Sequence, residues 1–182
     1  MVEFFNAHRD IIAQSIGFIA MGCMIVSYQS KKHKTIILLL IISTTFWSLH
    51  FLVLGSLTAF FVNILSVFRL IVYYFHDIGK KWASYKAIPW IFGIASTFAS
   101  IFTWAGPSDI LVVIAAILFS YANWQQNVRR LKYVSIPGAM LWLIYNVVNG
   151  SIAGVINEIL VLISISIYLI RTREKAVDKL TE

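Results

Sequence analysis

Seven apolar runs, separated by short connections, dominate this chain. Each is roughly 15 to 20 residues long, about the length at which a helix crosses the core of a bilayer. A composition that is 59% hydrophobic and 13% charged, with a mean hydropathy of +0.81, does not describe a soluble domain. The sequence therefore predicts an all-α integral membrane protein in contact with the lipid bilayer. The runs lie at approximately 11–28, 35–54, 57–75, 87–104, 109–125, 134–149 and 152–170.

Composition also excludes several classes of site. The first ten residues mix Glu3, Arg9 and Asp10 with aromatic residues, so we expect no cleaved signal segment and a first helix that stays in the membrane. Cys23 is the single cysteine, which excludes an internal disulfide and a cysteine-based metal site. We expect no metal and no cofactor. The net charge of +7 comes from basic residues in short loops, which favours contact with anionic lipid over binding of nucleic acid.

The basic residues lie on alternate connections of the chain. Among Lys and Arg, the other set of connections carries Arg9 alone. By the positive-inside rule, this asymmetry predicts a cytoplasmic C-terminus and an N-terminus on the outer face. The residues of the basic set are Lys31, Lys32, Lys34, Lys80, Lys81, Lys86, Arg129, Arg130, Lys132, Arg171, Arg173, Lys175 and Lys179.

An internal repeat relates two parts of the chain. Residues 47–73 match residues 142–168 without a gap, and seven of these 27 positions are identical. The matches include Trp47 with Trp142 and a Gly-Ser turn at 55–56 with one at 150–151. Scarce residue types at a constant offset are hard to obtain by chance, so we interpret the repeat as a duplicated membrane unit. Such units are typical of transporters, in which the substrate lies between the halves.

The repeat unit contains three spans, and this odd number predicts a seven-helix layout. A second copy fused directly would be inverted, so the fourth span returns the chain and leaves two parallel three-helix bundles joined by an inversion-linker helix. We expect the first bundle at 11–75, the linker and fourth helix at 76–104, the second bundle at 105–170 and a cytoplasmic tail at 171–182.

Two short motifs resemble those of known transporters. Tyr28-Gln29 and Trp124-Gln125 each end the first helix of a repeat and precede a basic loop. This pattern resembles the PQ-loop of the SWEET and SemiSWEET sugar transporters and their lysosomal relatives, in which a Pro-Gln pair forms a hinge. Tyr28 and Trp124 replace the Pro here. The resemblance implies a gate or hinge role for Gln29 and Gln125.

A closer resemblance is to the YgjV family of bacterial inner-membrane proteins. It is carried by the Tyr28-Gln29 pair, by residues 46–51 (FWSLHF) and by residues 104–106 (WAG). This resemblance implies a multi-pass protein of the bacterial inner membrane. The PnuC-type vitamin transporters share the seven-helix layout, so the layout does not fix the solute.

Polar residues inside apolar runs are the candidate site residues, because an ionisable group at membrane depth costs at least about 2.5–3.5 kcal/mol. The repeat places Glu158 opposite Asn63. Glu158, with the adjacent Asn157, either binds substrate or carries a coupling proton. Alternatively, the Glu158 carboxyl bonds to Asn63, Asn146 or Tyr145 and only holds helices together.

Aromatic and amide side chains gather near the same depth. His50 lies one helical turn after Trp47, and Tyr145 and Asn146 occupy the equivalent region next to Trp142. Rings that stack on a flat solute, with amide and imidazole groups at its edges, would suit a small neutral polar substrate. The alternative is an aromatic belt at the membrane surface.

Three further features concern the opposite end of the helices. Arg69 is expected to extend toward lipid phosphates. Asn123, near Gln125, is assigned to a helix terminus and inner gate. Pro137 removes one hydrogen bond from the sixth span and is a candidate hinge.

These observations favour a small-solute transporter that alternates access between two bundles. The solute would be a sugar, a nucleoside or a vitamin. A membrane scaffold or receptor subunit that transports nothing is the alternative, and the oligomeric state, including a homo-oligomer, is left open. The four His are dispersed and no catalytic motif occurs, so we expect no enzyme.

Overall fold

The protein is a bundle of seven α-helices with one short 3-10 helix, as seen in a computed structural model that describes residues 2–181 and the side chains of residues 8–172. No strand occurs among the described residues. The helices are α1 (Val2–Gln29), α2 (His33–Leu54), α3 (Leu57–Asp77), α4 (Ile88–Thr103), α5 (Asp109–Trp124), α6 (Val128–Val148) and α7 (Ile152–Thr181), with η1 (Lys81–Ala83) before α4.

Five of these helices contain spans long and apolar enough to cross a membrane. The spans are His8–Gln29, His33–Leu54, Leu57–Asp77, Val128–Val148 and Ile152–Thr172. The helices α4 and α5 are also apolar but have 16 residues each, which corresponds to about 24 Å of helix. The described residues therefore form an all-α membrane protein in which two helices are shorter than a full span.

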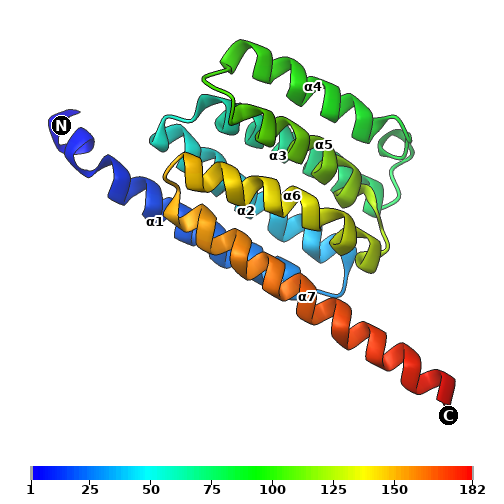
Figure 1. Cartoon of the computed structure of the whole chain (residues 1–182). Helices are drawn as coiled ribbons and strands as arrows, with labels where there is room; N and C mark the ends of the chain where they lie inside the picture. The colour runs from blue at the N-terminus through cyan, green and yellow to red at the C-terminus, as the bar shows by residue number, and fades with distance from the viewer. Residues whose placement is uncertain (1, 182) are drawn as a thin grey trace.

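Six helices form a closed ring, and α4 lies outside it. Along the ring, α1 packs against α2, α2 against α3, α3 against α5, α5 against α6, α6 against α7, and α7 against α1. The outer helix α4 packs against α3 and α5, as Figure 1 shows at the edge of the bundle farthest from α1 and α7. Large apolar side chains of α4, such as Ile94, Phe98 and Phe102, are exposed, as expected for a surface in contact with lipid.

The two ends of the bundle differ in their connections. At the turn end, residues 55–56 join α2 to α3, residues 104–108 join α4 to α5, and residues 149–151 join α6 to α7. Gly55 (φ 87°) and Gly150 (φ 67°) adopt left-handed conformations that end α2 and α6. At the basic end lie the connections 30–32, 78–87 and 125–127. The tight turns pack α2 against α3 and α6 against α7 as antiparallel pairs.

The sixth helix begins earlier than the sequence predicts, at Val128 instead of residue 134. The side chain of Asn127 accepts a hydrogen bond of 3.1 Å from Arg130 N and so caps the first turn. Lys132 was expected in a loop but is fully buried in α6. The tail expected at 171–182 continues α7 to Thr181; residue 182 and the side chains from residue 173 onward lie outside the described residues.

Two apolar clusters form the core. One, toward the basic end, includes Ile37, Leu70 and Leu131. The other, toward the turn end, includes Phe51, Val62 and Tyr145. The candidate site lies where these two clusters meet.

Candidate functional site

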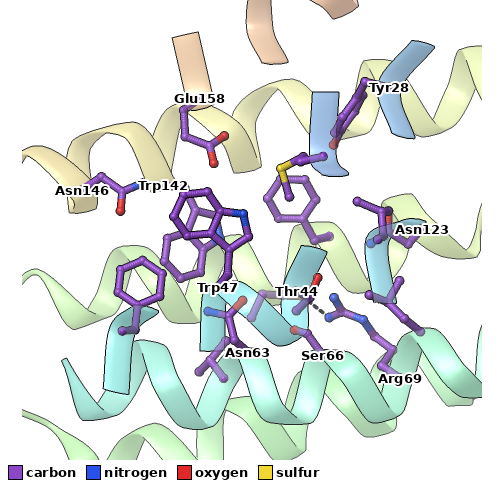
Figure 2. Close-up of a pocket in the computed structure, with 17 residues that line it drawn as sticks. Tyr28, Thr44, Trp47, Asn63, Ser66, Arg69, Asn123, Trp142, Asn146 and Glu158 are labelled. Carbon is purple, nitrogen blue, oxygen red and sulfur yellow. Dashed lines mark hydrogen bonds between the residues drawn. The ribbon is translucent and has the colours of Figure 1, made fainter. Parts of the chain in front are cut away.

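A cavity of about 70 Å³ lies inside the ring of six helices. One water needs about 10–15 Å³ of such space, so the cavity has room for a few water molecules. It extends along the helices from Asn146, near the turn end, to Tyr28 and Asn123, near the basic end (Figure 2). The polar groups that line it, apart from aromatic residues, are Thr44, Asn63, Ser66, Arg69, Asn123, Asn146 and Glu158.

Five of the site residues expected from the sequence line this one cavity. They come from four helices: α2, α3, α6 and α7. Both pairs related by the internal repeat, Trp47 with Trp142 and Asn63 with Glu158, are among them. The five residues are Trp47, Asn63, Trp142, Asn146 and Glu158.

Three other expected site residues lie beside the cavity but do not line it. Both ring nitrogens of His50 are engaged, Nδ1 with Ala13 O at 2.7 Å and Nε2 with Ser151 Oγ at 2.8 Å. Tyr145 lines a separate pocket at the turn end. Asn157 is fully buried.

Aromatic rings close the cavity toward the turn end. The Phe51 ring lies 6.1 Å from that of Trp47 and 5.4 Å from that of Trp142, measured between centroids. The His50 and Tyr145 rings pack edge-on behind them. Trp47 is 5% exposed, so its ring belongs to the interior of the bundle and not to a belt facing lipid. These contacts give the cavity a flat apolar wall.

Four polar atoms of the cavity lining are buried without a hydrogen-bond partner. Trp47 Nε1 and Arg69 Nε are donors, whereas Asn123 Oδ1 and Asn146 Oδ1 are acceptors. A buried polar group without a partner costs about 1–3 kcal/mol, and native proteins leave few of them. Their concentration around one cavity marks this part of the bundle interior as polar, with donors and acceptors both close to the cavity.

Arg69 extends into this cavity, and its expected extension toward lipid phosphates is wrong. Its side chain is 2% exposed, and Nη1 donates to the carbonyl oxygen of Ala116 in α5 at 3.1 Å. Figure 2 shows the guanidinium beside Ser66 and Thr44. Arg69 is enclosed because α5 packs against α3 along the face that carries it.

Glu158 is 8% exposed and faces the cavity from α7. Its Oε1 accepts a hydrogen bond of 2.9 Å from Asn157 Nδ2. Among the described residues it forms no hydrogen bond with Asn63 or Asn146; Asn63 Nδ2 donates instead to Ala59 O at 2.8 Å. The carboxyl therefore keeps acceptor capacity that is directed at the cavity.

Contacts near Gln29 close the cavity at the basic end between α1, α6 and α7. Gln29 Nε2 donates to Ser164 Oγ in α7 at 3.0 Å. The Lys132 ammonium donates to the carbonyl oxygen of Tyr28 at 2.6 Å and lies 3.8 Å from the centroid of the Tyr168 ring. Since Tyr28 lines the cavity, these contacts fix part of its wall.

A second group of contacts closes the basic end between α2, α3 and α5. His33 Nδ1 lies 2.7 Å from Asp77 Oδ2, and His33 Nε2 lies 3.0 Å from the carbonyl oxygen of Asn123. The neighbouring Gln125 follows α5, and its Nε2 donates back to the carbonyl oxygen of Tyr121 in α5 at 3.3 Å. Asn123, assigned from the sequence to an inner gate, thus lines the cavity and also joins the closing contacts.

Pro137 lies inside α6, which continues from Val128 to Val148 without interruption. Its side chain is exposed on the bundle surface. Because proline has no N–H, the carbonyl of Tyr133 loses its usual partner one turn ahead. Pro137 is therefore placed to allow bending of α6 but not to contact a molecule in the cavity.

The described residues contain no group of three or more His, Cys, Asp or Glu side chains that could hold a metal ion.

Comparison with known proteins identifies the family. The family model for the Imp-YgjV bacterial inner membrane proteins matches residues 11–176, nearly the whole chain. The chain belongs to the YgjV family. The family expected from the Tyr28-Gln29 pair and the segments at 46–51 and 104–106 is thereby confirmed. No curated protein and no solved structure matches the chain significantly.

Membership of the YgjV family, with five helices that can cross a membrane, gives a multi-pass protein of the bacterial inner membrane. The sequence did not indicate Arg69 as a cavity residue of this YgjV protein. A signal was present, because Asn63, Ser66 and Arg69 follow one another at intervals of three and therefore share one face of α3.

Proposed function

We propose that this YgjV protein is a transporter of a small polar solute and that the cavity inside the ring is its binding site. The observation that carries the proposal is the set of four buried polar atoms without partners around that cavity. A scaffold that only packs helices together would gain nothing from leaving these atoms unpaired.

The internal repeat supports alternating access between two halves. On this proposal α1–α3 and α5–α7 are parallel bundles and α4 is the linker that restores their orientation. The ring contacts are compatible with such a pairing, since α3 packs on α5 just as α7 packs on α1. Trp47, Trp142, Asn63 and Glu158, which are equivalent in pairs by the repeat, would then face the solute from both halves.

The small cavity volume and the closing contacts fit an occluded conformation. Phe51 and the two Trp rings close the cavity toward the turn end, and the Lys132–Tyr28 and His33–Asp77 contacts close the basic end. A solute larger than a few water molecules would enter only after one of these ends separates. Gln29, Gln125 and Pro137 are the residues at which we propose that the helices bend.

Glu158 is proposed to carry a coupling proton. Among the residues with described side chains, it is the one acidic residue in the cavity lining, and its hydrogen bond comes from Asn157. A carboxyl that can gain and lose a proton inside the cavity would couple solute movement to the proton gradient.

An uptake screen tests the proposed function. Purified protein in proteoliposomes would be supplied with radiolabelled sugars, nucleosides, vitamins and small carboxylates, each measured against protein-free vesicles. We expect at least one class to accumulate or exchange. A folded protein that moves none of them would support the alternative of a scaffold or receptor subunit.

A further inference from the structure

Arg69 is a buried basic side chain in the wall of a cavity inside the membrane. It belongs to the span Leu57–Asp77 and is 2% exposed. A desolvated charge is costly unless an opposite charge or a full set of hydrogen bonds compensates it. What compensates the Arg69 guanidinium is therefore informative about the molecule that binds beside it.

The protein itself compensates Arg69 only in part. Nη1 bonds to the carbonyl oxygen of Ala116, and Nε has no partner. Among the described residues, no carboxylate oxygen lies within 4.0 Å of the guanidinium. Guanidinium groups bind carboxylates with two parallel N–H donors. Arg69 lines the cavity, and its one described hydrogen bond, from Nη1 to Ala116, leaves the other donors of the guanidinium uncommitted.

Glu158 does not fill this role, although it lines the same cavity. Its described hydrogen bond is with Asn157 at 2.9 Å. Figure 2 shows Glu158 and Arg69 on opposite walls, one from α7 and the other from α3. Asn63 is the cavity residue that the repeat pairs with Glu158. It precedes Arg69 by six residues, which corresponds to about 9 Å along α3. The cavity thus has a basic group toward one end and an acidic group toward the other.

We infer that the solute of this cavity is a small organic acid, whose carboxylate binds Arg69 and whose hydroxyl or amino group faces Glu158. This inference rests on the proposed function and narrows it, because a neutral solute would leave Arg69 uncompensated. The carboxylate would accept from Arg69 Nε and from Nη atoms that are not committed to Ala116.

The remaining lining groups suit the body of such a molecule. The rings of Trp47 and Trp142 provide flat apolar surface in the wall of the same cavity. Trp47 Nε1 can donate to an oxygen, and Asn146 Oδ1 can accept from a hydroxyl or amine. A compact hydroxy or amino acid would therefore pair with polar atoms to which the protein itself offers no partner.

Matched pairs of probes test the inference, since a carboxylate and its primary amide differ in charge but little in shape. Suitable pairs are 4-hydroxybenzoate with 4-hydroxybenzamide and 3-hydroxypropionate with 3-hydroxypropionamide. Each probe would be titrated against the purified protein, with the melting temperature as the readout, and then tested for uptake into proteoliposomes. We expect the carboxylates, and not the amides, to raise the melting temperature.

Two variants of Arg69 make the test specific. Arg69→Gln should weaken carboxylate binding about ten- to a hundredfold, as expected for loss of a charged hydrogen bond. Arg69→Lys keeps the charge but loses the two parallel donors of the guanidinium. Its affinity for carboxylates should therefore lie between those of the wild type and Arg69→Gln. Arg9→Gln is the matched control, because Arg9 bonds to the backbone at Val53 and Leu54 outside the cavity and should leave the preference for carboxylates unchanged.

Melting without any probe provides a second readout. An uncompensated buried charge destabilises the empty protein, so Arg69→Gln should melt at or above the temperature of the wild type. A purely structural Arg69 predicts lower stability and an unchanged preference between carboxylate and amide. That result would overturn the inference.

The outcomes also separate this inference from the proposed function. Carboxylates that stabilise the wild type through Arg69 but do not enter vesicles would support the inference and contradict transport. Uptake of the amides with exclusion of the carboxylates would support transport and overturn the inference. If the wild-type protein melts cooperatively and no carboxylate raises its melting temperature, the inference is likewise overturned.

Discussion

The His50 ring nitrogen Nε2 lies 2.8 Å from the hydroxyl oxygen of Ser151, which fixes α2 to the turn between α6 and α7. On its other side, Nδ1 donates to the carbonyl oxygen of Ala13 in α1, since a carbonyl only accepts. One fully buried side chain thus joins three parts of the bundle at the turn end. Its interactions indicate a role in packing rather than in solute contact.

We predict that His50→Ala destabilises the protein by about 1–3 kcal/mol, because two hydrogen bonds and the ring contacts with Trp47 and Phe51 are lost. Solute affinity per folded molecule should change little. Thermal melting and probe binding in detergent measure the two effects. Leu49→Ala, on the exposed side of the same helix, is the control. Loss of binding without loss of stability would instead place His50 in the solute site.

Glu158→Gln should impair function more than folding. A glutamine keeps an acceptor oxygen for Asn157 Nδ2 of the same helix, and among the described residues Glu158 forms no hydrogen bond to another helix that the substitution would remove. The variant should insert and purify normally but lose concentrative, pH-dependent uptake, whereas exchange of solute persists. Asp10→Asn, an exposed carboxylate at the turn end, is the control. Normal accumulation with an unchanged pH profile would remove the proton-coupling role.

Lys132→Met should loosen the basic end of the cavity. The substitution removes the bond to Tyr28 O and the ammonium contact with the Tyr168 ring while keeping the length of the side chain. The fold should persist, since removing a buried charge lowers its desolvation cost. In a Cys23→Ser background, Ser66→Cys in the cavity wall should react several times faster with a maleimide in inside-out vesicles.

The control for the Lys132 experiment is Lys80→Met, since Lys80 is exposed in the connection before α4. It should leave the labelling rate unchanged. If the Lys132→Met protein is labelled by the maleimide no faster than the protein with Lys132 intact, the Lys132–Tyr28 bond does not restrict opening of the basic end.

The membrane orientation is also testable. Thirteen Lys and Arg residues lie in or next to the connections of the basic end and along the C-terminal segment, whereas the turn end has Arg9 alone, so the C-terminus should be cytoplasmic. A fluorescent protein fused after residue 182 should fluoresce, and alkaline phosphatase fused there should be inactive. Strong phosphatase activity would overturn both the orientation and the parallel arrangement of the repeats.

Several features of the candidate site could be predicted from sequence because they depend on local spacing. Trp47 with Trp142 and Asn63 with Glu158 are paired by the repeat, and all four line one cavity. Arg69 could have been added, since it shares a helical face with Asn63. Because Arg69 lies near the basic end of α3, the sequence suggested that its side chain extends toward lipid. In the structure α5 packs against α3 and encloses the Arg69 side chain.

Other residues illustrate the limit of reasoning from spacing. His50 follows Trp47 by three residues and so lies on nearly the same face of α2, yet it binds Ala13 and Ser151 instead of lining the cavity. A difference of one helical turn in depth decided this. The sequence placed Lys132 in a basic loop. In the structure, Asn127 caps α6 ahead of Lys132, so that Lys132 belongs to the helix and is buried.

The sequence by itself determined the helical class, the family and the candidate residues at membrane depth, since these follow from apolar run lengths, short motifs and the cost of polar groups in lipid. The tertiary structure decided which faces meet. It closed six helices into a ring with α4 outside, and it placed Arg69 and Glu158 on opposite walls of one cavity. Helix packing depends on side chains far apart in sequence, so periodicity alone could not specify those contacts.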